Sequence, residues 1–175
     1  SYYGIVDKKL CALFLVSLVY QNGYFGFPLD PEKARVGFER LLSDESKKNT
    51  DEKSIHNCVI GYCAEFGLVD VQQDSDRASA NYLRAINAGF VPALFLSIAN
   101  GCSVLKGAEL KQALMDCVNQ EFVPAIGFLG MRYLDGQWKK LFKKQTEKGL
   151  NLLEIAALQG DMPSQVILCE TYKQG

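Results

Sequence analysis

A short motif recurs along this chain of 175 residues, and it limits the possible folds more than any other feature. The sequence GFVPA at residues 89–93 returns as EFVPA at residues 121–125, and a weaker copy, GDMPS, occupies residues 160–164. Each copy follows a pair of small or apolar residues and precedes an apolar stretch. Internal similarity at a period of about 20 to 50 residues is typical of chains built from stacked repeats.

A second pattern follows the copies, and its spacing indicates an α-helix. From Ala125, a leucine, a glycine, a tyrosine and a further glycine stand at fixed offsets, as Leu129, Gly130, Tyr133 and Gly136. The same offsets recur from Ala12 and Ser164, and in part from His56, whereas the stretch from Ala93 departs from them. Small residues at such positions let a second helix cross closely, because helix axes lie about 8 to 10 Å apart.

A second helix is expected after each first one. Two segments agree position for position in an aspartate, a basic residue, an alanine and an aromatic residue: Asp30, Lys33, Ala34 and Phe38 match Asp74, Arg77, Ala78 and Tyr82. Aspartate is a favoured N-cap, since its carboxylate accepts hydrogen bonds from the free amides of the first turn. The repeated unit is therefore a helix–turn–helix.

This combined pattern resembles the Sel-one-like repeat, a relative of the tetratricopeptide repeat. The resemblance implies an all-α fold, a right-handed α-solenoid of stacked helix–turn–helix repeats, because one unit cannot bury its own apolar face. It covers nearly the whole chain, which we interpret as a single repeat domain and a piece of a longer protein. The expected units are 12–55, 56–92, 93–124, 125–163 and 164–175, the last being the first helix of a further unit.

The units differ in length at two places. The third lacks the aspartate signal, so we expect a distorted or truncated first helix between Ala93 and Asn100 and a second helix from about Ala108 to Asn119. The first unit is long because of the mixed-charge stretch 43–54, which we expect to be a solvated loop or a helical extension. The apolar run 10–19 has the composition of a signal-peptide core, but the repeat pattern runs through it and favours a repeat helix.

Six cysteines are present without CxxC spacing or a zinc pattern. Cys117 and Cys169 stand where the repeat has an alanine and a glycine, so we expect both to be small core residues. Some exported members of the resembled family bridge the helices of a unit, and Cys102 with Cys117 is the pair that comes nearest to that arrangement. Reduced thiols favour the cytoplasm; export or an ER-lumenal location stays open.

Composition gives little support to catalysis or to nucleic-acid binding. The formal net charge is −1, whereas nucleic-acid binding requires a concentrated positive field. His56 is the only histidine, and it stands two residues from Cys58, so the two side chains point to different faces of a helix. We interpret His56 as a packing or capping residue rather than a catalytic base. We predict no catalytic residues, no metal ligands and no cofactor.

The first helices supply the candidate contact residues. In the related tetratricopeptide arrangement these helices line the concave surface, and carrying over the helical phase predicts a stripe for a helical or extended peptide. The predicted residues are Phe14, Leu18, Tyr62, Phe66, Phe95, Phe128, Met131 and Leu134. Alternatively, a tight superhelix buries part of this stripe, and binding shifts to the loops.

The segment 137–144 holds the single tryptophan and four lysines. Three interpretations stay open: an amphipathic turn that exposes only its lysines, a protein-contact loop, and a site for nucleic acid or lipid. As a contact loop it would use Trp138, Lys139, Lys140 and Phe142.

The sequence therefore predicts an adaptor or scaffold whose partner is a protein or peptide, with no nucleic acid and no membrane insertion. Its oligomeric state stays open. Two alternatives remain: a thiol-dependent or β-lactamase-like hydrolase, and a purely structural segment of a larger complex.

Overall fold

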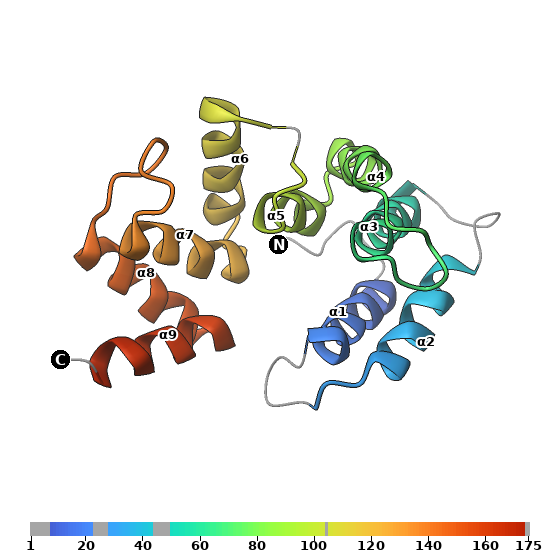
Figure 1. Ribbon diagram of the computed structural model, residues 1–175, viewed down its shortest axis with the longest axis horizontal. Helices are drawn as coiled ribbons and strands as arrows, with labels where there is room; N and C mark the ends of the chain where they lie inside the picture. The colour runs from blue at the N-terminus through green and yellow to red at the C-terminus, as the bar shows by residue number, and fades with distance from the viewer. Residues whose placement is uncertain (1–7, 23–27, 44–49, 104, 174–175) are drawn as a thin grey trace. The chain divides into compact units, whose positions relative to one another are not determined.

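The computed structural model is all-α and describes residues 8–22, 28–43, 50–103 and 105–173 (Figure 1). These ranges contain no strand, in agreement with the predicted fold class. The helices are α1 (Lys8–Asn22), α2 (Pro31–Leu42), α3 (Thr50–Phe66), α4 (Ser75–Asn87), α5 (Val91–Ala99), α6 (Gly107–Asn119), α7 (Val123–Asp135), α8 (Thr146–Leu158) and α9 (Met162–Lys173).

The predicted caps start the second helices of the first two repeats. Asp30 precedes α2, and its Oδ1 accepts a hydrogen bond of 3.1 Å from the Lys33 amide. Asp74 precedes α4, and its Oδ1 accepts one of 2.9 Å from the Arg77 amide. Each bond satisfies an amide that has no partner inside the helix. The aspartate prediction is confirmed at both positions.

The helices of a repeat pair where small residues let the backbones approach. A side-chain carbon added to Gly61 of α3 would lie 3.2 Å from the Ala78 carbonyl oxygen of α4. One added to Gly130 of α7 would lie 3.0 Å from the Gly149 carbonyl oxygen of α8. Both distances are tighter than ordinary contact, so larger residues at these crossings would force the helices apart.

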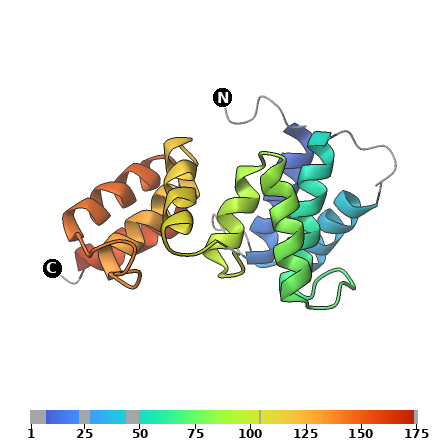
Figure 2. The same cartoon turned by 90° about the horizontal axis from the view of Figure 1, so that it is seen from above.

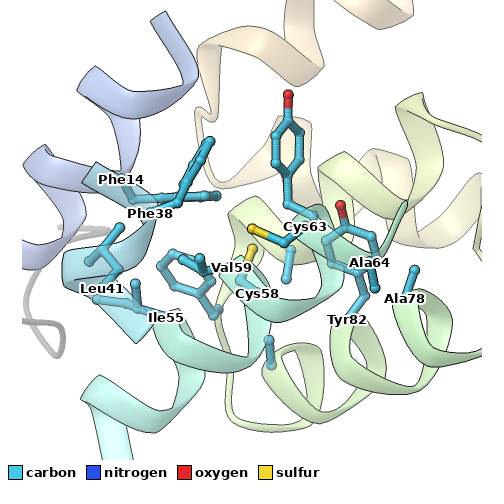
Figure 3. Close-up of a cluster of buried hydrophobic side chains, with 14 of the residues drawn as sticks. Phe14, Phe38, Leu41, Ile55, Cys58, Val59, Cys63, Ala64, Ala78 and Tyr82 are labelled. Atoms are coloured by element: carbon cyan, nitrogen blue, oxygen red, sulfur yellow. The ribbon is translucent and has the colours of Figure 1, made fainter. Parts of the chain in front are cut away.

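The chain divides into two compact units, residues Ser1–Val104 and Leu105–Gly175. In the first, α3 packs against α1, α2, α4 and α5. Its core gathers Phe14, Phe38, Ile55, Cys58 and Tyr82, all almost completely buried, and Figure 3 shows several of these side chains converging around α3.

The second unit contains α6 to α9, drawn from yellow to red in Figure 2. Here α7 packs against α6, α8 and α9, and Leu114, Leu129 and Leu153 fill the space between these helices. Gly136 ends α7 in the left-handed conformation, with a φ of 66°, and turns the chain into the loop that leads to α8.

The third expected repeat contains a short helix and a longer one. α5 spans only 9 residues, and α6 begins at Gly107, which confirms the short first helix and the second helix expected in the third repeat. The division between the two compact units falls inside that repeat, between α5 and α6. Of the mixed-charge stretch, residues 44–49 lie outside the described residues, and α3 already begins at Thr50.

The cysteine predictions are partly confirmed. All six thiols are free, including Cys102 and Cys117, so the structure contains no bridge between that pair. Cys117 is buried as expected, but Cys169 is exposed. The prediction that Cys169 is a core residue is wrong. The equivalent residue of α7 is Gly130, which is buried by α8, the second helix of its repeat. Within the described chain, no second helix of the same repeat packs on α9, so Cys169 stays exposed.

Candidate protein-binding surface

An arginine and two aromatic rings form a cluster where α7 passes into the following loop. Phe128 and Arg132 stand one turn apart on α7, and Trp138 returns from the loop. The Phe128 and Trp138 rings meet edge to face with their centroids 5.4 Å apart. The Arg132 guanidinium carbon lies 5.0 Å from the Phe128 centroid and 6.0 Å from that of Trp138. This is the geometry of cation–π contact.

Hydrogen bonds fix the guanidinium in this position. Arg132 Nη1 donates to Gln137 Oε1 at 2.8 Å, and Nη2 lies 3.1 Å from the Asp135 carboxylate. Its Nε is buried and has no partner within the described part of the chain. Only 15% of the Arg132 side chain is exposed, so its conformation is largely set before any partner arrives.

The loop after α7 is held by its own backbone and by Phe142. The Trp138 carbonyl oxygen accepts hydrogen bonds from the amides of Leu141 (2.8 Å) and Phe142 (2.7 Å). The Phe142 ring packs edge to face on Tyr133, with centroids 5.5 Å apart. This anchoring buries Phe142 and leaves Lys139 and Lys140 exposed. The backbone hydrogen bonds and the buried Phe142 ring therefore hold the loop in one conformation, with Lys139 and Lys140 facing outward.

A lysine-lined depression adjoins this loop, with a volume of about 310 Å³. Lys111 reaches it from α6, and Lys139, Lys140 and Lys143 line it from the loop. The Lys111 ammonium lies 5.5 Å from the Phe142 ring centroid. Among the described residues, no acidic side chain lines this depression, so its potential is positive.

Three predicted contact residues are buried, which corrects the expectation that they face an open surface. Phe14 packs against Phe38 and Phe90, with ring centroids 6.4 and 6.5 Å away. Tyr62 packs against Phe38, and its hydroxyl oxygen accepts a hydrogen bond of 3.1 Å from Asn22 Nδ2. Phe142 is 2% exposed for the reason given above. Helical phase predicted a common face for the first helices but could not show how closely α1, α2 and α3 approach.

The other predicted residues keep exposed surface, but they are divided between the two units. Phe66 is 48% exposed and lies against Tyr62 in the first unit. Leu18 and Phe95 of that unit are half-buried, as are Phe128, Met131, Leu134 and Trp138 of the second unit. Among the predicted residues, the Phe128 ring contacts that of Trp138, and the Phe66 ring contacts that of Tyr62.

Arg132, Lys111 and Tyr133 belong to this surface but were not predicted from the sequence. The sequence could have predicted the position of Arg132. It is the only charged residue between Glu121 and Asp135, and it stands four positions after Phe128, so the two side chains are neighbours on one helix face. The position of Lys111 could not be predicted in this way, because only the packing of α6 on α7 brings Lys111 to the loop.

The possible catalytic pair is a packing arrangement. His56 is buried, and its Nδ1 lies 3.2 Å from the Leu41 carbonyl oxygen, which can only accept a hydrogen bond. Burial raises the pKa of Cys63 to about 12 and holds that of Cys58 well above its usual range. Nucleophilic cysteines need the opposite shift.

The described residues contain neither a metal-binding cluster nor a membrane-spanning helix. Among them, no three His, Cys, Asp or Glu side chains group in a way that could hold a metal ion. Within the same residues, no helix is both long and apolar enough to cross a membrane.

Comparison with known families now assigns the repeats. The model of the Sel1 repeat matches residues 12–36, 58–90 and 123–161, together more than half of the chain. The chain belongs to the Sel1 repeat family. The matches fall on the helix pairs α1–α2, α3–α4 and α7–α8, whereas α5, α6 and α9 lie outside them. Sel1 repeats are generally non-catalytic scaffolds for protein interaction, which supports a binding role for this Sel1 repeat protein.

Among solved structures, the chain is similar to a crystal structure of a Sel1 repeat protein from Oxalobacter formigenes. The identity is 23% and the TM-score 0.46, over 89% of this chain and 60% of that chain. This Sel1 repeat protein therefore spans less than two thirds of the length of that relative. No curated protein sequence matches it.

Proposed function

We propose that this Sel1 repeat protein is an adaptor that binds a protein partner through the α7 surface and the loop that follows it. The cluster of Phe128, Arg132 and Trp138 carries the proposal, because its side chains are partly exposed yet already fixed by mutual contacts. Arginine and tryptophan are enriched among the residues that dominate interface energetics. Fixing them beforehand lowers the entropic cost of association.

The surroundings of the cluster also suit an interface. Met131 and Leu134 add half-buried apolar surface on α7, and Lys139 and Lys140 add exposed charge at the edge. An apolar centre with a polar rim is the usual anatomy of a protein interface. Phe66, with Leu18 and Phe95, supplies further candidate contacts in the first unit.

A photo-crosslinking amino acid placed at Met131 tests this proposal, with the same group at Glu170 of α9 as the matched control position. In an extract of the source organism, the Met131 probe should form a defined adduct with a partner protein, and the Glu170 probe should not. Trp138→Ala in the Met131 probe protein should lower the adduct yield by about tenfold. Lys173→Ala should leave it unchanged.

Circular dichroism should show equal helicity in all variants, because Trp138 lies outside the helices, Glu170 and Lys173 are exposed on α9, and Met131 is only half-buried on α7. Equal adduct yields from the two probe positions, or capture that survives Trp138→Ala, would show that the α7 surface is not the contact. Absence of any adduct would favour a purely structural segment.

A further inference from the structure

We propose that the lysine-lined depression of the second unit binds an acidic peptide segment, rich in aspartate or glutamate, of the protein partner. This specificity rests on the adaptor function proposed above and names the chemistry of the segment that the partner presents. It assigns a role to Lys111, Lys139, Lys140 and Lys143, which the architecture of the fold does not explain.

The depression concentrates positive charge that no neighbouring carboxylate in the described ranges neutralises. Four ammonium groups line it, and none of them forms an ion pair with a carboxylate of the described chain. A second depression, at the start of α8, differs in that an acidic residue, Glu147, lines it together with Lys148. Like charges gathered in a concave site repel one another, and an anionic ligand relieves that repulsion.

The wall of the depression offers a neutral hydrogen-bond donor as well. Tyr133 lines it, and the Tyr133 hydroxyl oxygen already accepts a hydrogen bond of 3.1 Å from Lys148 Nζ. The hydroxyl proton itself has no acceptor among the residues that the structure describes. A carboxylate entering the depression can accept that proton in a hydrogen bond while it pairs with the lysines.

The same geometry disfavours nucleic acid. Stacking of bases requires exposed aromatic faces, but Phe142 is 2% and Tyr133 7% exposed. Lys111 and Lys148 additionally lie over the Phe142 and Tyr133 rings. The volume of about 310 Å³ suits a few side chains, not a continuous phosphate backbone.

Fluorescence anisotropy of labelled synthetic peptides tests this specificity with the full chain. The probe is a peptide of glutamate and leucine, and its control replaces every glutamate by glutamine. We expect the glutamate peptide to bind at least about tenfold more tightly, and increasing salt to weaken it, since exposed charges are screened. A phosphoserine peptide and a single-stranded RNA of equal charge are measured beside it.

Charge-matched variants locate the binding. Lys139→Glu with Lys140→Glu should weaken the glutamate peptide by at least about tenfold. Lys106→Glu with Lys173→Glu changes the net charge equally outside the depression and should weaken it by less than about threefold. All four side chains are exposed, so these variants should fold, which melting curves will verify.

Three outcomes would overturn the acidic specificity: equal binding of the glutamine peptide, equal weakening by both double variants, or tighter binding of the phosphopeptide or the RNA. A protein captured at Met131 whose contact region carries no acidic segment would also overturn it, while the adaptor function would stand. Conversely, peptide binding at the depression without any capture at Met131 would contradict the adaptor function and support the depression as a site for carboxylates.

Discussion

Cys63 and Cys117 show how burial controls chemistry at the level of single residues. Both thiols lie in the apolar interior, and desolvation raises the pKa of each to about 12. Cys169 has the same functional group on the surface of α9. Reaction with thiol reagents requires both the thiolate and access to it, so these cysteines should differ strongly in rate.

We predict that native protein at pH 8 shows one fast-reacting thiol towards a disulfide reagent such as Ellman's reagent. Cys169→Ala should remove the fast phase, whereas Cys117→Ala should leave it intact. Denaturation without reductant should expose all six thiols, which are free in the structure. A fast phase that survives Cys169→Ala would contradict the assigned exposure, and a total of four thiols would reveal a disulfide.

Pairs of helices depend on the absence of side chains where they cross. Gly149 of α8 faces the Gly130 carbonyl oxygen and the Leu134 amide of α7, and an added carbon would lie 2.9 Å from both atoms. Both neighbours are backbone, which cannot rotate away. The helices would have to separate, and the packing around Leu153 would loosen.

We therefore predict that Gly149→Ala destabilises the protein, although alanine is the better helix former by about 1 kcal/mol. Overpacking should outweigh propensity and lower the free energy of unfolding by about 1 to 3 kcal/mol. Asn151→Ala, at an exposed position of the same helix, should change stability little or raise it. Urea denaturation followed by circular dichroism measures both. A Gly149→Ala protein more stable than wild type would contradict the close α7–α8 crossing.

At the scale of the whole molecule, each compact unit carries its own core. In the first unit, the Glu65 carboxylate links three helices. It accepts hydrogen bonds from the Tyr82 hydroxyl at 2.8 Å and from Asn100 Nδ2 at 3.0 Å. Tyr82 is almost fully buried, so loss of its acceptor leaves a polar group unsatisfied in the interior. In repeat proteins, a local loss of stability mainly affects the neighbouring repeats, because each repeat contacts only its neighbours.

We predict that Glu65→Ala accelerates amide hydrogen exchange in α3, α4 and α5 without a matching change in α7 and α8. The local cost should be about 1 to 3 kcal/mol, the usual penalty of a buried unsatisfied group. Glu65→Gln should cost less, because its amide oxygen still accepts a hydrogen bond. Equal acceleration in α7 and α8 would show that the two compact units unfold as one cooperative body.

The sequence by itself determined the features that depend on neighbours along one helix. The N-cap at Asp74 needs only the amide three residues later, and the short α5 follows from the missing repeat signal after Ala93. The small residue at Gly130 marks a crossing wherever the repeat occurs. These are local rules of spacing, so the helices and the repeat class were predictable before any coordinates.

Only the tertiary structure decided which of the candidate residues remain accessible. The burial of Phe14 and Tyr62 depends on Phe38, which approaches from another helix, and helical phase has no information about that approach. Likewise, Lys111 meets Lys139 and Lys143 only because α6 packs on α7. The exposure of a side chain and the electrostatic potential around it depend on every helix and loop that packs nearby. Both are therefore set only when the helices have packed together.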